Sequence, residues 1–303
     1  MYGRMLFATI SVAAAWGQSA APTAEKQMEF EVASVKPSVP RGPTNANFPL
    51  GPGDVYVPNG GYFSATGFPL SVYIGFAYKI MGNQAQYLRD QLPDWVRSEP
   101  YDIQARASGN PTKDEMRLMM RSLLAERFKL AMHHEMREGP VYALVVWKPG
   151  KLGPHLYPHA DDGSPCPTKP APKDEAPASV PPRVASGELP FLCGGVFVMD
   201  SKGPGLQRAA ARNINIGFMT GTLLNIGGLD RPVVDRTGLS GAYDMSVEWA
   251  PDVKCPPGEE CQNDDAGPSF ERAMREQLGL TLESQKGPID RLILDHVERP
   301  SGN

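Results

Sequence analysis

The sequence predicts an α+β protein of two duplicated lobes, each of β-α-β-β type, joined by a proline-rich linker. The first observation is an internal repeat, because residues 101–146 and 243–294 show the same order of strand-like and helical segments. The second is the hydrophobic period, which alternates in the strand-like segments and becomes helical between them. The third is the proline-rich stretch between the copies. The matched positions are Tyr101-Asp102 with Tyr243-Asp244, Phe128, Leu130 and Met132 with Leu278, Leu280 and Leu282, and Gly139-Pro140 with Gly287-Pro288.

Composition divides the chain into four segments. Its 303 residues are enough for two ordinary domains. The linker is marked by nine prolines between Pro154 and Pro182. We expect a signal peptide at residues 1–21, a first α+β lobe at 28–149, a linker at 150–193 and a second α+β lobe at 194–299.

The N-terminus has the features of a signal peptide. Arg4 supplies a positive charge, Met5–Trp16 is apolar, and small residues follow through Ala21. The apolar run is shorter than the ~20 residues that a membrane span needs. A buried N-terminal helix is the alternative. We expect an exported protein, periplasmic or extracellular, with no stable membrane span after cleavage.

The first lobe is expected to open with strands and one buried helix. Residues 30–36 are rich in β-branched side chains, which predicts a strand. Residues 37–61 are rich in Pro, Gly and Asn and predict a loop, and residues 62–66 predict a short strand. Apolar side chains at helical spacing then predict a helix over residues 70–78.

The repeated unit follows this helix. Residues 101–107 alternate between apolar and polar, as in a half-buried strand. Thr112 and Glu115 form a capping box that opens a helix. The unit is expected to close with strands 129–137 and 141–147 around the turn Glu138-Gly139-Pro140.

The second copy has the same elements. We expect a helix over residues 216–226, a strand over 243–249, and a helix from Phe270 that ends at Gly279. Two strands joined at Gly287-Pro288 close the lobe. Loops that differ around matching core positions favour duplication, and chance resemblance is the alternative.

Four cysteines flank irregular loops, Cys166 with Cys193 and Cys255 with Cys261. An even count in an exported chain predicts two disulfides, although three pairings are open. A zinc site is the alternative, but the CxxC and His-x-His spacings that would favour it do not occur.

Charge and motifs restrict the function classes. The formal net charge of −4, with no long run of Lys or Arg, makes a nucleic-acid partner unexpected. The chain lacks the G-x-S-x-G elbow, the penicillin-binding set, the P-loop and the dinucleotide fingerprint. We therefore assign no catalytic, cofactor-binding or metal-binding residues and expect no cofactor.

The densest polar cluster lies in the first copy. On a strand, His133, Glu135 and Arg137 would share one face. A metal site or an acid–base pair needs a third convergent group, which the local sequence does not offer. An ordinary charged strand face is the simpler interpretation, and these residues remain weak functional candidates.

Four sequence blocks carry a resemblance to a known family: FEVASVKPS, LLAERFKLAMHHEMREGPVYALVVWKPG, RPVVDRTGLSGAYDMSVEWAPD and LGLTLESQKGPIDRLILDHVERPS. They resemble exported proteins of unknown function that occur in many copies in acidobacterial (Solibacter-type) genomes. The resemblance implies export and a domain of unknown function, which is sometimes attached to membrane metallopeptidases of the beta-lactam-sensor type. The segment AMREQLGLTLESQKGPIDRLIL is also similar to short interaction modules of secretins and TonB-dependent receptors.

Together these observations predict a secreted or periplasmic, non-catalytic module that acts as a sensor or scaffold. Its expected partner is an envelope protein or a small envelope ligand. The alternative is an envelope hydrolase or metal-dependent enzyme that uses His133 and Glu135.

Overall fold

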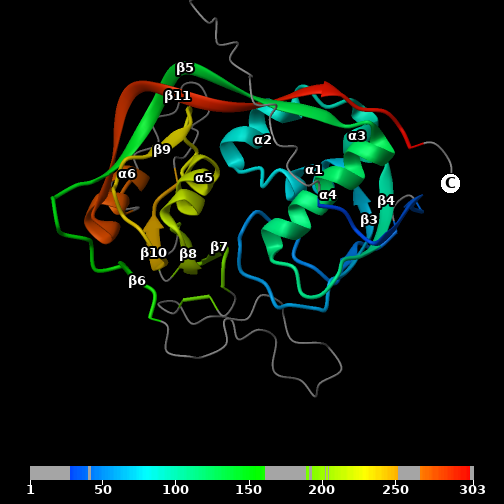
Figure 1. Ribbon diagram of the computed structural model, residues 1–303. Coiled ribbons are helices and arrows are strands. Elements are labelled where there is room, and N and C mark those ends of the chain that lie inside the picture. Colours follow the sequence, from blue (N-terminus) through cyan, green and yellow to red (C-terminus); the bar gives the residue numbers. More distant parts are fainter. Residues whose placement is uncertain are drawn as a thin grey trace, which may run out of the picture.

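The computed structural model describes two hydrophobic cores bridged by one long antiparallel pair of strands (Figure 1). The described residues are 28–39, 42–160, 189–190, 193–201, 203, 205–251 and 267–300. Helices and sheets both contribute, so the predicted α+β class is confirmed. The expected signal peptide and most of the expected linker lie outside these residues. None of the described helices is long and apolar enough to cross a membrane.

The first lobe is a four-stranded antiparallel sheet covered by helices. Its strand order is β1, β4, β3, β2. The strands are β1 (Val32–Pro37), β2 (Asn45–Ala46), β3 (Tyr62–Pro69) and β4 (Pro100–Arg106), and the helices are α1 (Leu70–Ala77), α2 (Gly82–Arg89), α3 (Asp94–Ser98) and α4 (Lys113–Phe128). The sequence reasoning missed α2 and α3, because both are short and α2 is mostly polar.

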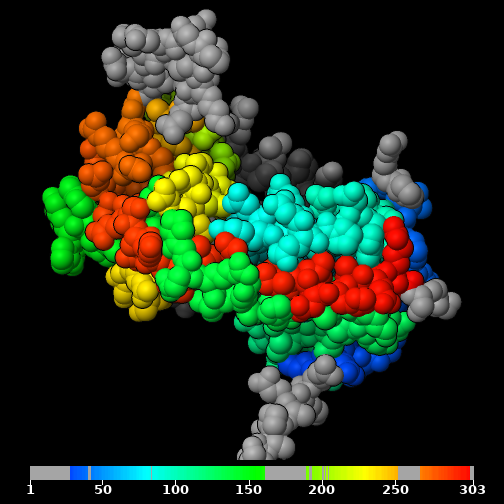
Figure 2. Space-filling model, turned by 90° about the horizontal axis from the view of Figure 1, so that it is seen from above, coloured from blue at the N-terminus to red at the C-terminus, as the bar shows by residue number. Residues whose placement is uncertain are grey.

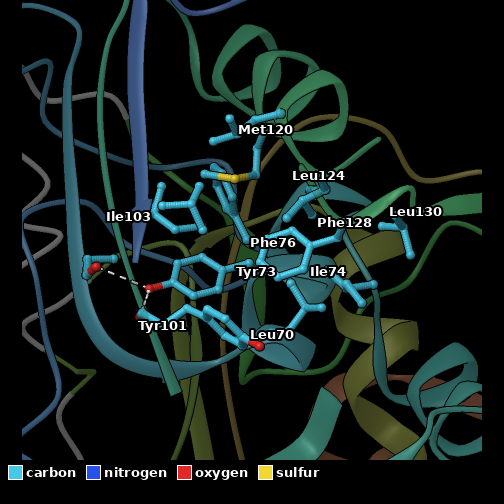
Figure 3. Packing of buried hydrophobic residues seen from close by; sticks show 14 of the residues in the cluster. Leu70, Tyr73, Ile74, Phe76, Tyr101, Ile103, Met120, Leu124, Phe128 and Leu130 are labelled. Carbon is cyan, nitrogen blue, oxygen red and sulfur yellow. Dashed lines mark hydrogen bonds between the residues drawn. The ribbon is translucent and has the colours of Figure 1, made fainter. Parts of the chain in front are cut away.

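Helix α4 begins where the sequence predicts. The Thr112 hydroxyl accepts the Glu115 N–H at 3.2 Å, and the Glu115 carboxylate accepts the Thr112 N–H at 2.6 Å. The helix ends at Lys129, whose φ of 51° is left-handed. Its buried side chains Met120 and Leu124 lie in the first core with the aromatic residues of α1 (Figure 3).

The second lobe also contains a four-stranded sheet, in the order β6, β10, β8, β7. Its strands are β6 (Leu156–Pro158), β7 (Val196–Asp200), β8 (Gln207–Ile214) and β10 (Tyr243–Trp249). Its helical segments are α5 (Ile216–Ile226), α6 (Phe270–Ala273) and the π-helical turn η1 (Met274–Leu278), which ends at the left-handed Gly279. Strand β6 falls within the segment that the sequence reasoning assigned to the linker.

A long two-stranded ribbon, β5 (Ala131–Val146) and β11 (Leu280–His296), runs across both lobes (Figure 1). Strand β9 (Val233–Asp235) pairs with β5 in parallel. Leu292 of β11 lies in the first core, whereas Leu144 of β5 lies in the second. Each strand therefore contributes its two halves to different lobes.

The predicted hairpins at Glu138-Gly139-Pro140 and at Gly287-Pro288 are wrong, because the chain runs straight through both positions. Gly139 and Gly287 are instead directly opposite each other in the ribbon. A Cβ on Gly139 would lie 2.7 Å from Cδ1 of Ile289. The glycine there marks a close approach across the ribbon, which is the other common reason for glycine in a strand.

The two sheets share one irregularity. The register steps from Ala65↔Ile103 to Phe68↔Tyr101 in the first sheet, and from Ala211↔Met245 to Ile214↔Tyr243 in the second. In both, one strand advances three residues while its partner advances two, as in a β-bulge. The extra residues include Gly67 (φ 77°) and Asn213 (φ 53°), and a helix starts three residues after each of them.

Helix α2 lies between the lobes, along β11 and against α5 (Figures 1 and 2). Its first residue, Gly82, approaches α5 so closely that a Cβ would lie 2.6 Å from the Gly221 carbonyl oxygen. The Gln84 amide donates to Asp290 at 3.0 Å. The Gln91 amide, just beyond α2, donates to the Leu292 carbonyl and accepts the Leu294 N–H. Side chains thus continue the hydrogen bonding at this edge of the ribbon.

Candidate functional site

The three candidates from the sequence, His133, Glu135 and Arg137, lie on β5 and are solvent-accessible. His133 Nδ1 lies 2.8 Å from Oδ1 of Asp295 on β11, and Arg137 Nε lies 2.9 Å from Oε1 of Glu135. In the ribbon register, Glu135 is opposite Arg291. The structure adds the Asp295 carboxylate to the expected cluster and arranges the charges as surface pairs.

The neighbouring histidine fixes the helix that joins the lobes. His134 Nδ1 lies 2.9 Å from Oδ1 of Asp290, which also accepts from Gln84 of α2. The Arg291 guanidinium lies over the Tyr87 ring of α2, 4.4 Å from the ring centroid, which is within the range of a cation–π interaction. Within the described residues, no group of three His, Cys, Asp or Glu side chains is placed to hold a metal ion.

A partly open pocket, lined mainly by polar side chains, lies on the second lobe. It is a pocket of about 280 Å³, near the lower end of the size range of small-molecule sites. It is lined by His155, Tyr157, Leu189, Arg208, Ser246, Glu248 and Gln277. Because side chains alternate along β10, Met245 and Val247 enter the second core while Ser246 and Glu248 face this pocket.

Arg208 is the central cation of the pocket. Its side chain is only 3% exposed, and its Nε donates to Ser246 Oγ at 3.0 Å. Glu248 is its direct cross-strand partner in the β8–β10 register. Opposite charges at a cross-strand pair stabilise a sheet, and burial strengthens their interaction. The lining therefore combines a buried guanidinium on β8 with a carboxylate on the neighbouring strand β10.

Gln277 holds the rim of the pocket in place. Its side-chain oxygen accepts the Glu248 N–H at 2.9 Å, and its side-chain nitrogen donates to the Glu248 carbonyl at 2.7 Å. The amide therefore pairs with the edge of β10 as another strand would. The Ser201 hydroxyl also donates to the Glu248 carboxylate.

Tyr157 also lines the pocket, and its cross-strand partner Asp244 makes two polar contacts outside the lining. His159 Nδ1 lies 2.7 Å from Oδ1 of Asp244, a carboxylate that also accepts the Asn213 N–H at 2.8 Å. Burial raises the pKa of the Tyr157 phenol; Asp244 raises it further and Arg212 opposes this effect. Tyr157 is thus a neutral hydroxyl at physiological pH, able to donate and accept. The set suits orientation of a small polar ligand that carries both donors and acceptors.

Sequence reasoning missed this pocket for two reasons. His155 was assigned to the linker, and only the tertiary structure places it beside β10. The alternation in residues 243–249 predicts a strand but does not indicate what its polar side chains face. The available signal was Arg208 directly before the three alanines of β8, since a buried arginine is costly unless it is partnered.

The structure describes one of the four cysteines of the predicted disulfides. Cys193 is buried, and no cysteine within the described residues is a free thiol. Cys166, Cys255 and Cys261 lie outside the described residues. The two disulfides and their pairing therefore stay predictions.

Comparison with known proteins gives one match. The model of a family described as "Protein of unknown function (DUF3738)" matches residues 71–297. This range includes the second lobe, the whole ribbon, and the helices and β4 of the first lobe, whereas β1, β2 and β3 precede it. No curated protein and no solved structure matches the chain.

Proposed function

Because the chain belongs to the DUF3738 family of proteins of unknown function, we propose for it the role of an exported, non-catalytic binding module that holds a small polar ligand of the cell envelope. The observation that carries this proposal is the second-lobe pocket, where buried Arg208 and half-buried Ser246 and Glu248 lie on adjacent strands of one sheet. Export is supported by the N-terminal sequence and by the even cysteine count.

The proposal includes duplication of one ancestral unit. Its support is the shared bulge. Gly67 and Asn213 are both left-handed, the N–H of each donates to an aspartate carboxylate of the adjacent strand, and a helix starts three residues after each. Because function depends on the site and not on the fold, two lobes of one ancestry can differ in what they bind. The polar pocket belongs to one lobe only in this proposal.

The ligand class follows from the pocket chemistry. A guanidinium, a carboxylate, an imidazole and a phenol suit a molecule with an anionic group and several hydroxyl or amine groups. Amino sugars and short peptides of the cell wall have this chemistry. We therefore propose cell-wall fragments as the ligands.

Thermal unfolding of the mature protein with a panel of purified cell-wall fragments tests this proposal. A ligand present at about 100 times its Kd should stabilise the fold by ~2.7 kcal/mol. Tyr157→Phe should weaken the binding of that fragment about ten-fold, because one pocket hydroxyl is lost. Tyr62→Phe is the matched control, since Tyr62 is similarly exposed, at 40%, but lies on the first lobe.

Two results would count against the proposal. One is a panel in which no fragment shifts the unfolding temperature. The other is a shift that Tyr157→Phe and Tyr62→Phe leave equally unchanged, because the ligand would then bind elsewhere. Turnover of a fragment by the purified chain would replace the non-catalytic role with an enzymatic one.

One observation favours a second candidate, a hydrolase or metal-dependent enzyme at His133. The Asp295 carboxylate holds His133 by Nδ1, which leaves Nε2 available, as in many metal-binding and catalytic histidines. Metal analysis of wild type and His133→Ala distinguishes the candidates. Stoichiometric metal that the variant lacks would support the enzyme, and equal metal content would remove this argument.

A further inference from the structure

A second hollow lies in the first lobe, far from the polar pocket in the chain. It is a groove of about 370 Å³ between α1, α2 and α3. It is lined by Ser71, Gly75, Ile80, Ala85, Leu88, Arg89, Leu92 and Arg97. Its walls are mainly aliphatic, and the described residues that line it carry two positive charges and no negative charge.

Gly75 of α1 lines the groove, and neither its backbone conformation nor a close neighbour requires glycine at this position. Its backbone is not left-handed, and a Cβ built on it would meet no atom within 4 Å. Glycine in a helix is less favourable than alanine, so a neighbour normally explains it. Within the described residues, no side chain packs against the face of α1 that carries Gly75.

The second lobe shows what such a glycine accommodates. Helix α1 starts three residues after Gly67 and α5 starts three residues after Asn213, so Gly75 is equivalent to Gly221. A Cβ on Gly221 would lie 2.5 Å from Cε and 2.8 Å from Cβ of Met81. The methionine side chain packs against the second core from this position. The same helix face is thus filled in one lobe.

The difference arises from the segment that follows each helix. After α1, the chain places Met81 and the start of α2 against α5, and the later part of α2 forms a wall of the open groove. After α5, the chain forms β9 and pairs with β5 instead. The chain therefore fills the face at Gly221 with its own methionine and leaves the face at Gly75 as a groove.

We propose that the groove at Gly75 docks a segment of an envelope protein that inserts one apolar side chain not branched at Cβ, methionine or leucine, and has acidic residues beside it. The apolar part follows from the aliphatic walls and from Met81 at the equivalent position. The acidic part follows from charge complementarity with Arg89 and Arg97 at the mouth. Arg97 already pairs with Asp94 of α3, so Arg89 is the main partner for the incoming carboxylate.

This docking surface is separate from the proposed ligand pocket and extends the role from ligand binding to protein interaction. The groove takes residues from α1, α2 and α3 of the first lobe, whereas the pocket takes residues from β6, β8, β10 and η1 of the second. A binding partner at the groove would contact α2, which also touches α5 and β11. One helix therefore contacts both lobes and the proposed partner.

Selection from a display library of random short peptides on the mature protein tests the inference. The Gly75→Phe chain serves for counter-selection, because its ring would occupy the groove. Enriched peptides should contain methionine or leucine beside aspartate or glutamate. Gly75→Phe should weaken a selected peptide by on the order of ten- to a hundred-fold, the effect of losing one buried apolar anchor.

Charge variants and a second blocking variant complete the test. Arg89→Glu should weaken the same peptide, whereas Arg106→Glu, an exposed change on β4 of the same lobe, should leave its binding unchanged. If Gly75→Phe unfolds, Ser71→Phe blocks the groove one helical turn earlier. Cell-wall fragment binding at Tyr157 should be equal in all these variants, which separates this inference from the proposed function.

Three results would overturn the inference. The first is that no peptide is enriched over the counter-selected chain. The second is that enriched peptides bind Gly75→Phe and Ser71→Phe as well as wild type. The third is that dodecanoate stabilises the wild type but not Gly75→Phe, while no peptide stabilises the wild type. The groove would then accept a lipid chain.

Discussion

Asp102 and Asp244 have the same structural role in the two lobes. Oδ1 of Asp102 accepts the Gly67 N–H at 2.9 Å, and Oδ1 of Asp244 accepts the Asn213 N–H at 2.8 Å. In each lobe the donor is the left-handed residue of a β-bulge that leads into a helix. The carboxylate therefore stabilises the one point where the strand changes course before the helix begins.

The Asp102 carboxylate at the bulge should contribute measurably to the free energy of unfolding. Asp102→Ala leaves the Gly67 N–H without its acceptor, so we expect a loss of ~1–3 kcal/mol in urea unfolding. Asp102→Asn keeps a side-chain oxygen and should recover part of the loss. Exposed Asp90→Ala is the control, expected within ~0.5 kcal/mol of wild type. Equal stability of Asp102→Ala and Asp90→Ala would contradict this role.

Equivalent glycines of the two lobes should respond to alanine in opposite directions. Gly221→Ala places a methyl group against Met81, so it should destabilise the protein by ~1–3 kcal/mol through overpacking. Gly75→Ala places the same group in open space and should stabilise the protein by ~0.5–1 kcal/mol. Guanidinium unfolding of both variants measures the difference. Changes of the same sign and size would show that the two helix faces are equally filled.

Stability should rise with pH in the range set by Lys113. Burial and the nearby Arg117 guanidinium lower the pKa of Lys113 from 10.5 to about 8. Between these two values the unfolded chain binds more protons than the folded chain, so raising the pH favours folding. The contribution is at most ~3 kcal/mol over the whole range. Below pH 8 both states are protonated, so stability no longer changes with pH through Lys113 and the cost of burying its charge is fully present.

Unfolding of wild type and Lys113→Met at several pH values from 7 to 9.5 measures this contribution. The wild type should gain stability relative to the variant as the pH rises through 8. Exposed Lys36→Met is the control and should run parallel to the wild type. Parallel curves for wild type and Lys113→Met would show that Lys113 is not desolvated in the folded protein.

The cysteines offer a test of the compartment. If the chain is exported as expected, mass mapping of the unreduced mature protein should find no free thiol and an N-terminus after Gly17 or Ala21. Reduction should then lower stability by ~2–4 kcal/mol for each structural disulfide. Four free thiols in freshly isolated protein would contradict both the disulfides and the argument for export.

The sequence alone was informative where the signal is local. The Thr112 and Glu115 capping box, the alternation in β4 and β10, and the helical spacing in α4 and α5 each depend on residues close together in the chain. Such patterns predicted the α+β class and most of the repeated elements. They also placed His133, Glu135 and Arg137 on one strand face, because strand alternation is a local property.

Only the tertiary structure decided how these elements are connected in space. A Gly-Pro pair between two strand-like segments is compatible with a hairpin and with a straight crossing, and the local residues do not distinguish them. The crossing is selected because Leu144 and Leu292 reach cores that lie on opposite sides of Gly139 and Gly287. Contacts between residues so distant in sequence leave no periodic trace. The pairing of His133 with Asp295, the pocket around Arg208 and the groove at Gly75 all result from such contacts.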